Sequence, residues 1–246
     1  ITINGVAIDF NKQSFAWGRR AAHDLAAVES LVGTHASDEE TLTPEKMMAF
    51  RINELTAYQN AAHAARYSAQ IERIGRVEAE RTPALSGLSQ AVGESYFKLL
   101  TSKDEYEVAR LFSDGRFEKR LAEQFEGPLK LSFHLAPPLM GSRKRVFGSW
   151  MMGAFKLLAA LKVLRGTAFD IFGYSAERRL EGKITRDYES LLNEICQNLT
   201  PENHADAVAL AALPLSIRGF GSVKQRAADE AEGARTRLLE SFRKRL

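Results

Sequence analysis

The chain has 246 residues, of which 45% are hydrophobic and 26% charged, and its formal net charge at pH 7 is +3. This composition is typical of a globular protein long enough to bury its own core, and so small a basic excess argues against a dedicated nucleic-acid binder. The single cysteine, Cys196, excludes a disulfide within the chain and any site built from four of its own thiolates, and it fits a reducing cytoplasm.

The first ten residues predict a short β-hairpin, because β-branched and polar residues alternate around Asn4-Gly5. Asn11 is then expected to cap a helix. Residues 30–43 are small, polar and acidic, which indicates a loop or linker. A chain that opens on Ile1 in a strand-like segment is expected to be a fragment of a longer protein or a processed product.

Pro44 follows Thr43, the pattern of a helix start. The apolar residues that follow recur at helical spacing, so we expect one long helix from about Pro44 to Arg81. Pro83 cannot continue it.

Residues 95–117 are rich in charge, and two interpretations compete: a site for acid–base chemistry, or a helix with a solvated face. Glu107 and Arg110 are spaced to pair on one helix face, so most of the charge is expected to be solvated. Gly115 is expected to end the helix in a left-handed turn.

Asp104 is the exception, because Leu100 and Val108 place it within the apolar stripe of that helix. A buried carboxylate needs a partner. A structural ion pair or a helix cap is favoured over a catalytic base, with Arg116 as the expected partner.

The rest of the chain predicts one strand-like segment and several helices. Residues 129–135 alternate as in a strand, and residues 150–164 are apolar on most sides, which predicts a central helix. That apolar run is too short to span a membrane. The fold class is therefore mainly α: a multi-helix domain with a small β-hairpin or strand element at residues of about 1–10 and 129–135.

No complete catalytic, cofactor-binding or metal-binding motif is found in the sequence. The five histidines lack metal-site spacing, and Cys196 lies in an apolar helical stretch, where cysteine is usually inert. The glycines of residues 217–224 lack the spacing of a phosphate loop. The basic run Arg143, Lys144 and Arg145 is expected to be solvated surface or a contact with an acidic partner.

Six stretches, in this order, resemble one family: "FAWGRRAAHD", "YFKLLTSKDEYEVARLFSDGRFEKRLAEQFEG", "LSFHLAPPL", "RKRVFGSWM", "LRGTAFDIFGYSAERR" and "LPLSIRGFGSVK". Together they resemble the C-terminal region of the large fused indolepyruvate ferredoxin oxidoreductases. The join in "PPLMGSRKRVFG" is shorter than the family leads us to expect.

The resemblance implies a parent enzyme that oxidatively decarboxylates aryl pyruvates to acyl-coenzyme A and passes the electrons to ferredoxin. Such a parent uses thiamine diphosphate with Mg2+ and 4Fe–4S clusters, with coenzyme A as the acyl acceptor, and these lie in upstream units. Residues 1–20 would be the junction from a gamma-type unit, and residues 21–246 a single helical C-terminal domain that is inactive alone.

Two functions from different classes follow from this. In the first, the domain packs on the upstream catalytic units of its own chain or on a second subunit of a homodimer, with the strand at His134 and the basic run facing that interface. In the second, it is a free-standing helical protein–protein interaction module. Neither involves nucleic acid or a membrane.

Overall fold

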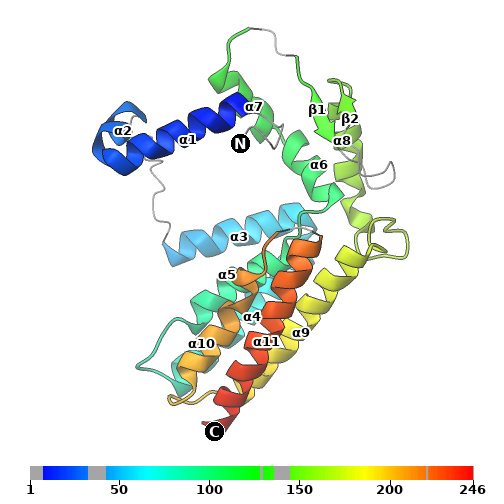
Figure 1. The fold of residues 1–246 in the computed structure, drawn as a ribbon. Helices are drawn as coiled ribbons and strands as arrows, with labels where there is room; N and C mark the ends of the chain where they lie inside the picture. Colours follow the sequence, from blue (N-terminus) through cyan, green and yellow to red (C-terminus); the bar gives the residue numbers. More distant parts are fainter. Residues whose placement is uncertain (1–7, 33–42, 128–129, 136–144, 220, 246) are drawn as a thin grey trace. The chain divides into compact units, whose positions relative to one another are not determined.

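The structure, a computed structural model, describes residues 8–32, 43–127, 130–135, 145–219 and 221–245. In these segments eleven α-helices and one antiparallel pair of short strands are found (Figure 1). The predicted fold class, mainly α with a small β-hairpin, is confirmed. No helix within these segments is long and apolar enough to cross a membrane.

The chain divides into two compact units, residues 1–47 and 48–246. In the first unit α1 (Ile8–His23) contacts α2 (Leu25–Val32), and no residue of α1 is buried. The hairpin predicted for residues 1–10 is wrong at residues 8–10, which are helical; Asp9 in the first turn favours the helix through its macrodipole. The rest of that hairpin, and positions 33–42 of the predicted loop, lie outside the described residues.

The single long helix predicted up to Arg81 is two helices, α3 (Pro44–Tyr58) and α4 (Ala61–Arg81). Asn60 separates them: it has an extended backbone, and its side-chain oxygen accepts a hydrogen bond of 2.9 Å from the His63 N–H. An asparagine at this position stabilises a new helix start, which periodicity alone does not reveal.

A second break divides the charged stretch into α5 (Leu88–Leu100), α6 (Glu105–Ser113) and α7 (Arg116–Gln124). The helix predicted to run through Asp104 therefore stops before it. Gly115 has a φ of 86°, so the predicted left-handed turn is confirmed.

Of the strand predicted for residues 129–135, only residues 133–135 form one: β1 (Phe133–Leu135), which pairs antiparallel with β2 (Arg145–Phe147). Residues 130–132 are not a strand, and residue 129 lies outside the described residues. His134 faces Val146 across the pair. The partner strand thus begins at Arg145, the last residue of the basic run, which is exposed there.

The central helix predicted for residues 150–164 is present as α8 (Met151–Ala160) and the 3-10 helix η3 (Leu161–Leu164), but it is not central. Only Met151 and Phe155 are buried, in a small cluster with Phe133. On another face of α8 the apolar side chain of Leu157 is exposed.

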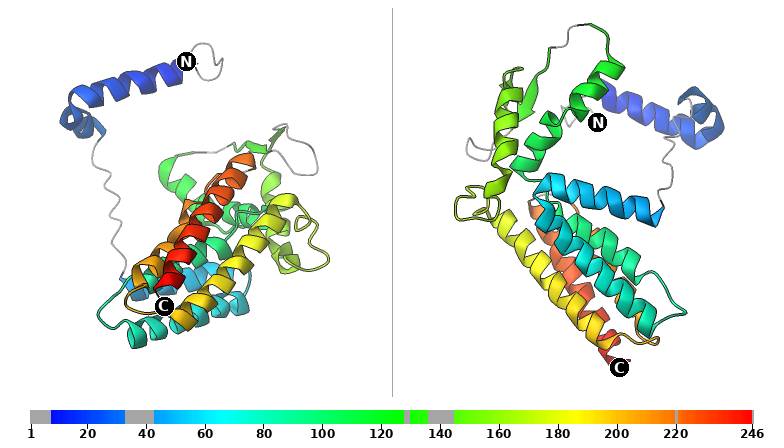
Figure 2. Two further views of the ribbon diagram at one scale, coloured as in Figure 1. Left: turned by 60° about the horizontal axis from the view of Figure 1, so that its bottom comes forward. Right: turned by 180° about the vertical axis from the view of Figure 1, so that it is seen from behind.

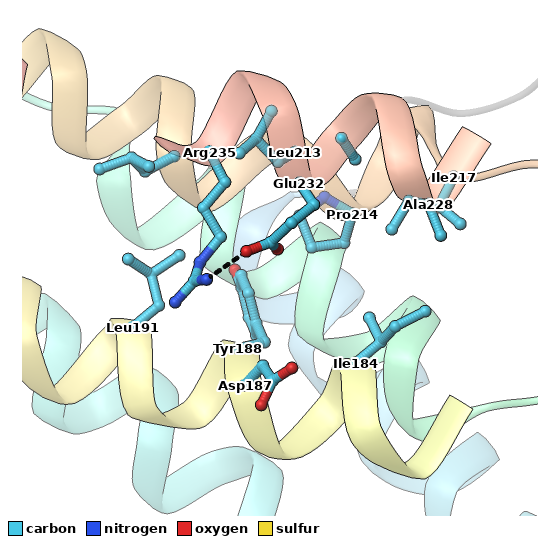
Figure 3. A pocket seen from close by; sticks show the side chains of 12 residues that line it. Ile184, Asp187, Tyr188, Leu191, Leu213, Pro214, Ile217, Ala228, Glu232 and Arg235 are labelled. Atoms are coloured by element: carbon cyan, nitrogen blue, oxygen red, sulfur yellow. Dashed lines mark hydrogen bonds and ion pairs between the residues drawn. The ribbon is translucent and has the colours of Figure 1, made fainter. Parts of the chain in front are cut away.

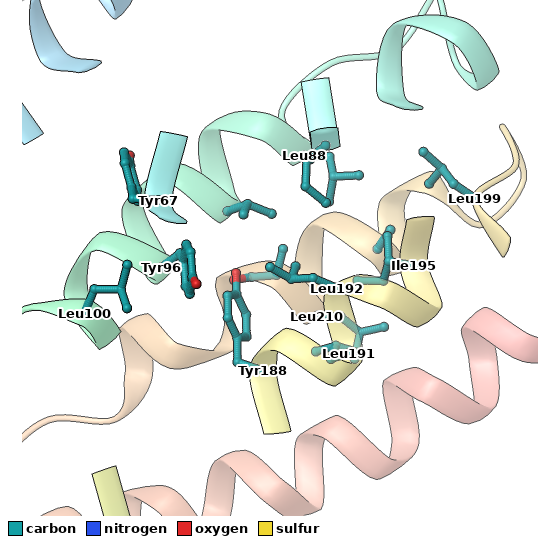
Figure 4. Close-up of a cluster of buried hydrophobic side chains, with 14 of the residues drawn as sticks. Tyr67, Leu88, Tyr96, Leu100, Tyr188, Leu191, Leu192, Ile195, Leu199 and Leu210 are labelled. Carbon is teal, nitrogen blue, oxygen red and sulfur yellow. The ribbon is translucent and has the colours of Figure 1, made fainter. Parts of the chain in front are cut away.

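The main core lies in a bundle made of α4, α5, α9 (Ala176–Asn198), α10 (His204–Ala212) and α11 (Ser222–Lys244), with the 3-10 helix η4 (Leu213–Ser216) after α10 (Figures 1 and 2). Figure 4 shows leucine and isoleucine side chains packed with three tyrosines, Tyr67, Tyr96 and Tyr188. The tyrosine hydroxyls find partners: that of Tyr188 donates to the Ala211 carbonyl at 2.9 Å.

Glu78, near the end of α4, caps the start of α5. Its carboxylate accepts hydrogen bonds from the backbone N–H groups of Leu88, at 2.8 Å, and Ser89, at 2.9 Å, and contacts the His204 ring nitrogen at 3.1 Å. Burial raises the pKa of Glu78, but these hydrogen bonds outweigh it, so the net pKa lies below its ordinary value.

We expect Glu78 to stabilise the fold at neutral pH and to lose that effect in acid. A carboxyl whose pKa is lower in the folded than in the unfolded chain contributes above the unfolded pKa of about 4.3 and loses its contribution as pH falls through the folded pKa. Urea unfolding should show Glu78→Gln less stable by about 1–3 kcal/mol near neutrality, with the gap to wild type closing toward about pH 3. Glu80→Gln, exposed on the same helix, is the control; a gap that does not vary with pH would contradict the assignment.

Candidate functional site

Asp104 lies where the start of α6, the end of α3, the segment after η3 and the first turn of α9 meet. Its carboxylate accepts two hydrogen bonds from Arg165, at 2.6 and 2.9 Å, and one from Arg178 at 3.0 Å. It also caps α6 by accepting from the Glu107 N–H at 2.8 Å. The predicted ion pair and the predicted cap are both present, in one residue.

Arg165 is fully engaged in this cluster. It donates to the Tyr58 carbonyl at 2.6 Å, and its guanidinium carbon lies 3.7 Å from the centroid of the Tyr58 ring. Burial, and then the charge of Asp104, raise the pKa of Tyr58 to about 12, so the phenol stays protonated. The cluster therefore ties four segments together through paired charges.

Arg116, the predicted partner of Asp104, binds Glu54 at 2.9 Å and Asp114 at 2.8 Å instead. α6 lies between Asp104 and Arg116, and its nine residues separate the two side chains by about 13 Å along the helix axis. Because the Asp104 side chain is only 1% exposed and its oxygens are occupied, it cannot contact a substrate. The interpretation as a catalytic base is thereby disfavoured.

A second buried carboxylate, Asp170, holds the loop between η3 and α9. It accepts hydrogen bonds from the N–H groups of Gly166, at 2.9 Å, and Gly173, at 3.1 Å, and from the Tyr106 hydroxyl at 3.2 Å. The same loop also contains consecutive turns. One of them is formed by the hydrogen bond from the Asp170 N–H to the Thr167 carbonyl. The loop is therefore fixed to α6 rather than free.

The segment of residues 146–174 holds large hydrophobic side chains out in solvent. The Phe169 side chain is 76% exposed, although its loop is fixed by Asp170. We call the members of this group the exposed apolar set: Val146, Trp150, Leu157, Leu161, Val163, Phe169, Ile171 and Tyr174. Large apolar residues held outward by a rigid framework are typical of protein-binding surfaces.

A cleft of about 390 Å3 opens beside the Asp104 cluster, between the end of α5, the first turns of α9 and the residues after η4. Lys98, which lines it, donates to the carbonyls of Pro214, at 2.8 Å, and Ile217, at 2.9 Å. Burial lowers the pKa of Lys98, and the nearby charges of Arg218 and Lys224 lower it further. The cleft is large enough for a small ligand.

A smaller pocket of about 70 Å3 lies between α9, α11 and the end of α10 (Figure 3). Apolar side chains make up most of its wall, and Glu232 and Arg235 form an ion pair of 2.9 Å beside it. Ligand sites usually exceed about 300 Å3, so this pocket is a packing gap in the bundle.

The remaining predicted site residues are not brought to Asp104. His134 and Arg145 are exposed on the β1–β2 pair, while Arg143 and Lys144 lie outside the described residues, as does most of the short join before β2. Within the described part of the chain no group of three or more potential ligands could hold a metal ion.

Sequence reasoning missed Arg165, Arg178 and Asp170. The two arginines lie 61 and 74 residues after Asp104, so no local pattern links them to it. The sequence offered one indication of these partners: a carboxylate predicted to be buried needs a cationic partner, which can come from any part of the fold.

A family model described as a family of unknown function, DUF6537, matches residues 44–237. The chain belongs to this family. The matched region contains the Asp104 cluster, the exposed apolar set and the cleft. No curated protein and no solved structure matches the chain.

Proposed function

We propose that this member of the DUF6537 family is a non-catalytic C-terminal domain of an indolepyruvate:ferredoxin oxidoreductase, and that it packs on the catalytic units of that enzyme. The observation that supports the packing role is the exposed apolar set, of which Phe169 and Ile171 lie on a loop that Asp170 holds in place. The resemblance of six stretches in order supports the choice of parent enzyme.

In this proposal the chemistry belongs to the upstream units. They bind thiamine diphosphate with Mg2+ and 4Fe–4S clusters, decarboxylate an aryl pyruvate, acylate coenzyme A and reduce ferredoxin in the cytoplasm. The domain covers and orients those units, within one chain or across a homodimer. The charge pairs of the Asp104 cluster keep its surface in one shape.

The α1 helix has apolar side chains that its own compact unit, residues 1–47, does not bury. None of its residues is buried, and it exposes Phe10, Phe15 and Trp17. A helix with large apolar residues and no buried side normally has a partner.

The test is the intact mass and cofactor content of the native polypeptide that carries the stretch "KDEYEVARL". We expect a mass several times 27.4 kDa, together with bound iron and thiamine diphosphate. A mass near 27.4 kDa without either would overturn the proposal and favour the free-standing interaction module.

A further inference from the structure

The cleft beside the Asp104 cluster has an excess of positive charge. Five cationic side chains line it, Lys98, Lys103, Arg178, Arg218 and Lys224, against the three carboxylates of Glu105, Glu177 and Glu181. Five against three leaves an excess of two positive charges. The excess is concentrated on a concave surface, which focuses the potential more than a convex one does.

Only some of these cations form ion pairs with the carboxylates of the cleft. Glu181 binds Arg178 at 2.8 Å and also binds Lys224. Arg178 divides its charge further, because it also binds Asp104. These contacts neutralise the wall formed by α9 and the first turn of α11.

The other three cations, Lys98, Lys103 and Arg218, form no ion pair with a described residue. Lys98 and Arg218 donate to backbone carbonyls of residues 214–217, which hold their positions without cancelling their charge. Lys103, in the segment after α5, is exposed and also lines the cleft. Three like charges in one concave site repel one another, and an anion bound among them would relieve that repulsion.

We propose that this cleft binds a small dianion with an apolar body, through Lys103 and Arg218. Lys98 adds its positive charge from the wall, because its three N–H groups are already donated to the carbonyls of Pro214, Leu215 and Ile217. The excess of two positive charges in the cleft matches the two negative charges of such a ligand. The volume of about 390 Å3 is large enough for a small molecule. Ile184, Leu99 and Ile217 supply apolar wall for the body. A phosphoryl group and a pair of carboxylates share this chemistry. The inference goes beyond the proposed function and does not depend on which parent the domain serves.

The experiment is calorimetric titration of the native polypeptide with three aromatic probes. Phenyl phosphate carries a phosphoryl dianion, phenylsuccinate carries two carboxylates, and benzyl alcohol is a neutral control. At least one dianion should bind saturably, and its Kd should rise when the salt concentration is raised from about 50 to about 300 mM. Tighter binding of one dianion identifies its head group as the preferred one.

Two double variants with the same loss of charge locate the site. Lys103→Gln with Arg218→Gln should raise Kd at least about tenfold, because charge-assisted hydrogen bonds are lost. Lys119→Gln with Arg120→Gln, exposed on α7 and away from the cleft lining, should change Kd less than about twofold. All four side chains are exposed, so the variants should melt like wild type.

The inference is overturned if neither dianion binds saturably, or if the two double variants weaken binding equally. Its failure is distinguishable from failure of the proposed function, because the latter is decided by intact mass and cofactor content. If only the cleft proposal fails, the mass and cofactor content are those of a large oxidoreductase and no dianion binds. If only the proposed function fails, the mass is near 27.4 kDa and a dianion still binds.

Discussion

Asp104→Asn should lower the stability of the unit of residues 48–246, called the helical unit below, by about 3 kcal/mol, because breaking a buried ion pair leaves an uncompensated charge. The asparagine keeps a cap for α6 but loses the charge that Arg165 and Arg178 require. The Arg165 side chain is 6% exposed, so water cannot take over that role. For a unit of this size the melting temperature should fall by about 6–12 °C.

The measurement is thermal unfolding, together with turnover of the oxidoreductase that we propose as the parent. Asp187→Asn, exposed on α9, is the matched control and should melt within about 1 °C of wild type. Turnover below the new melting point should be unaltered, since the Asp104 side chain reaches no solvent. A normal melting curve with lost turnover would reverse the assignment and make Asp104 a catalytic residue.

A second substitution separates the charge from the packing. If the cost of Asp104→Asn is the unpaired arginine charge, then Arg165→Met should be less harmful in the Asp104→Asn background than in wild type. The stacking of Arg165 on Tyr58 is lost in both backgrounds, so it cancels in the comparison. Additive effects would mean that the ion pair contributes little beyond the contacts of its members.

Local chemistry in the sequence was a good guide wherever one residue decided the structure. Pro44 begins α3, Gly115 ends a helix in a left-handed turn, and the stretch before Pro83 ends α4. Each of these outcomes depends on backbone conformation within a few residues. For the same reason Asp104 could be recognised as a cap or a pair, although not as both.

Long-range packing could not be predicted in the same way. The apolar content of residues 150–164 suggested burial, yet Leu157 in α8 and Val163 in η3 are exposed, because burial depends on which other elements pack against a face. The partners of Asp104 were missed for the same reason, since Arg165 comes from a distant loop. Asn60 shows the opposite error, in which a local cap was overlooked because apolar periodicity continued past it.

In the proposed packing, replacing two members of the exposed apolar set should weaken the contact between this domain and the surface that covers it by a factor of about 100 or more. Phe169→Ser with Ile171→Ser removes two large apolar anchors, each worth about 1.5–3 kcal/mol once buried against a partner. Hydrogen exchange at the amides of residues 165–175 should quicken by that factor in the native polypeptide. The unfolding free energy of the helical unit itself should stay within about 0.5 kcal/mol, because neither side chain is buried in it.

The matched control is Leu85→Ser with Val223→Ser, which removes two exposed apolar side chains from outside the set. It should leave exchange at residues 165–175 unchanged. Because Asp170 holds the loop by hydrogen bonds to Gly166 and Gly173, faster exchange after the Phe169 and Ile171 changes cannot come from loss of internal contacts. It would therefore report a protein surface that covers the loop. Equal exchange in wild type and both variants would mean that the loop is solvated in the native polypeptide, and the packing role would then have to rest on another face.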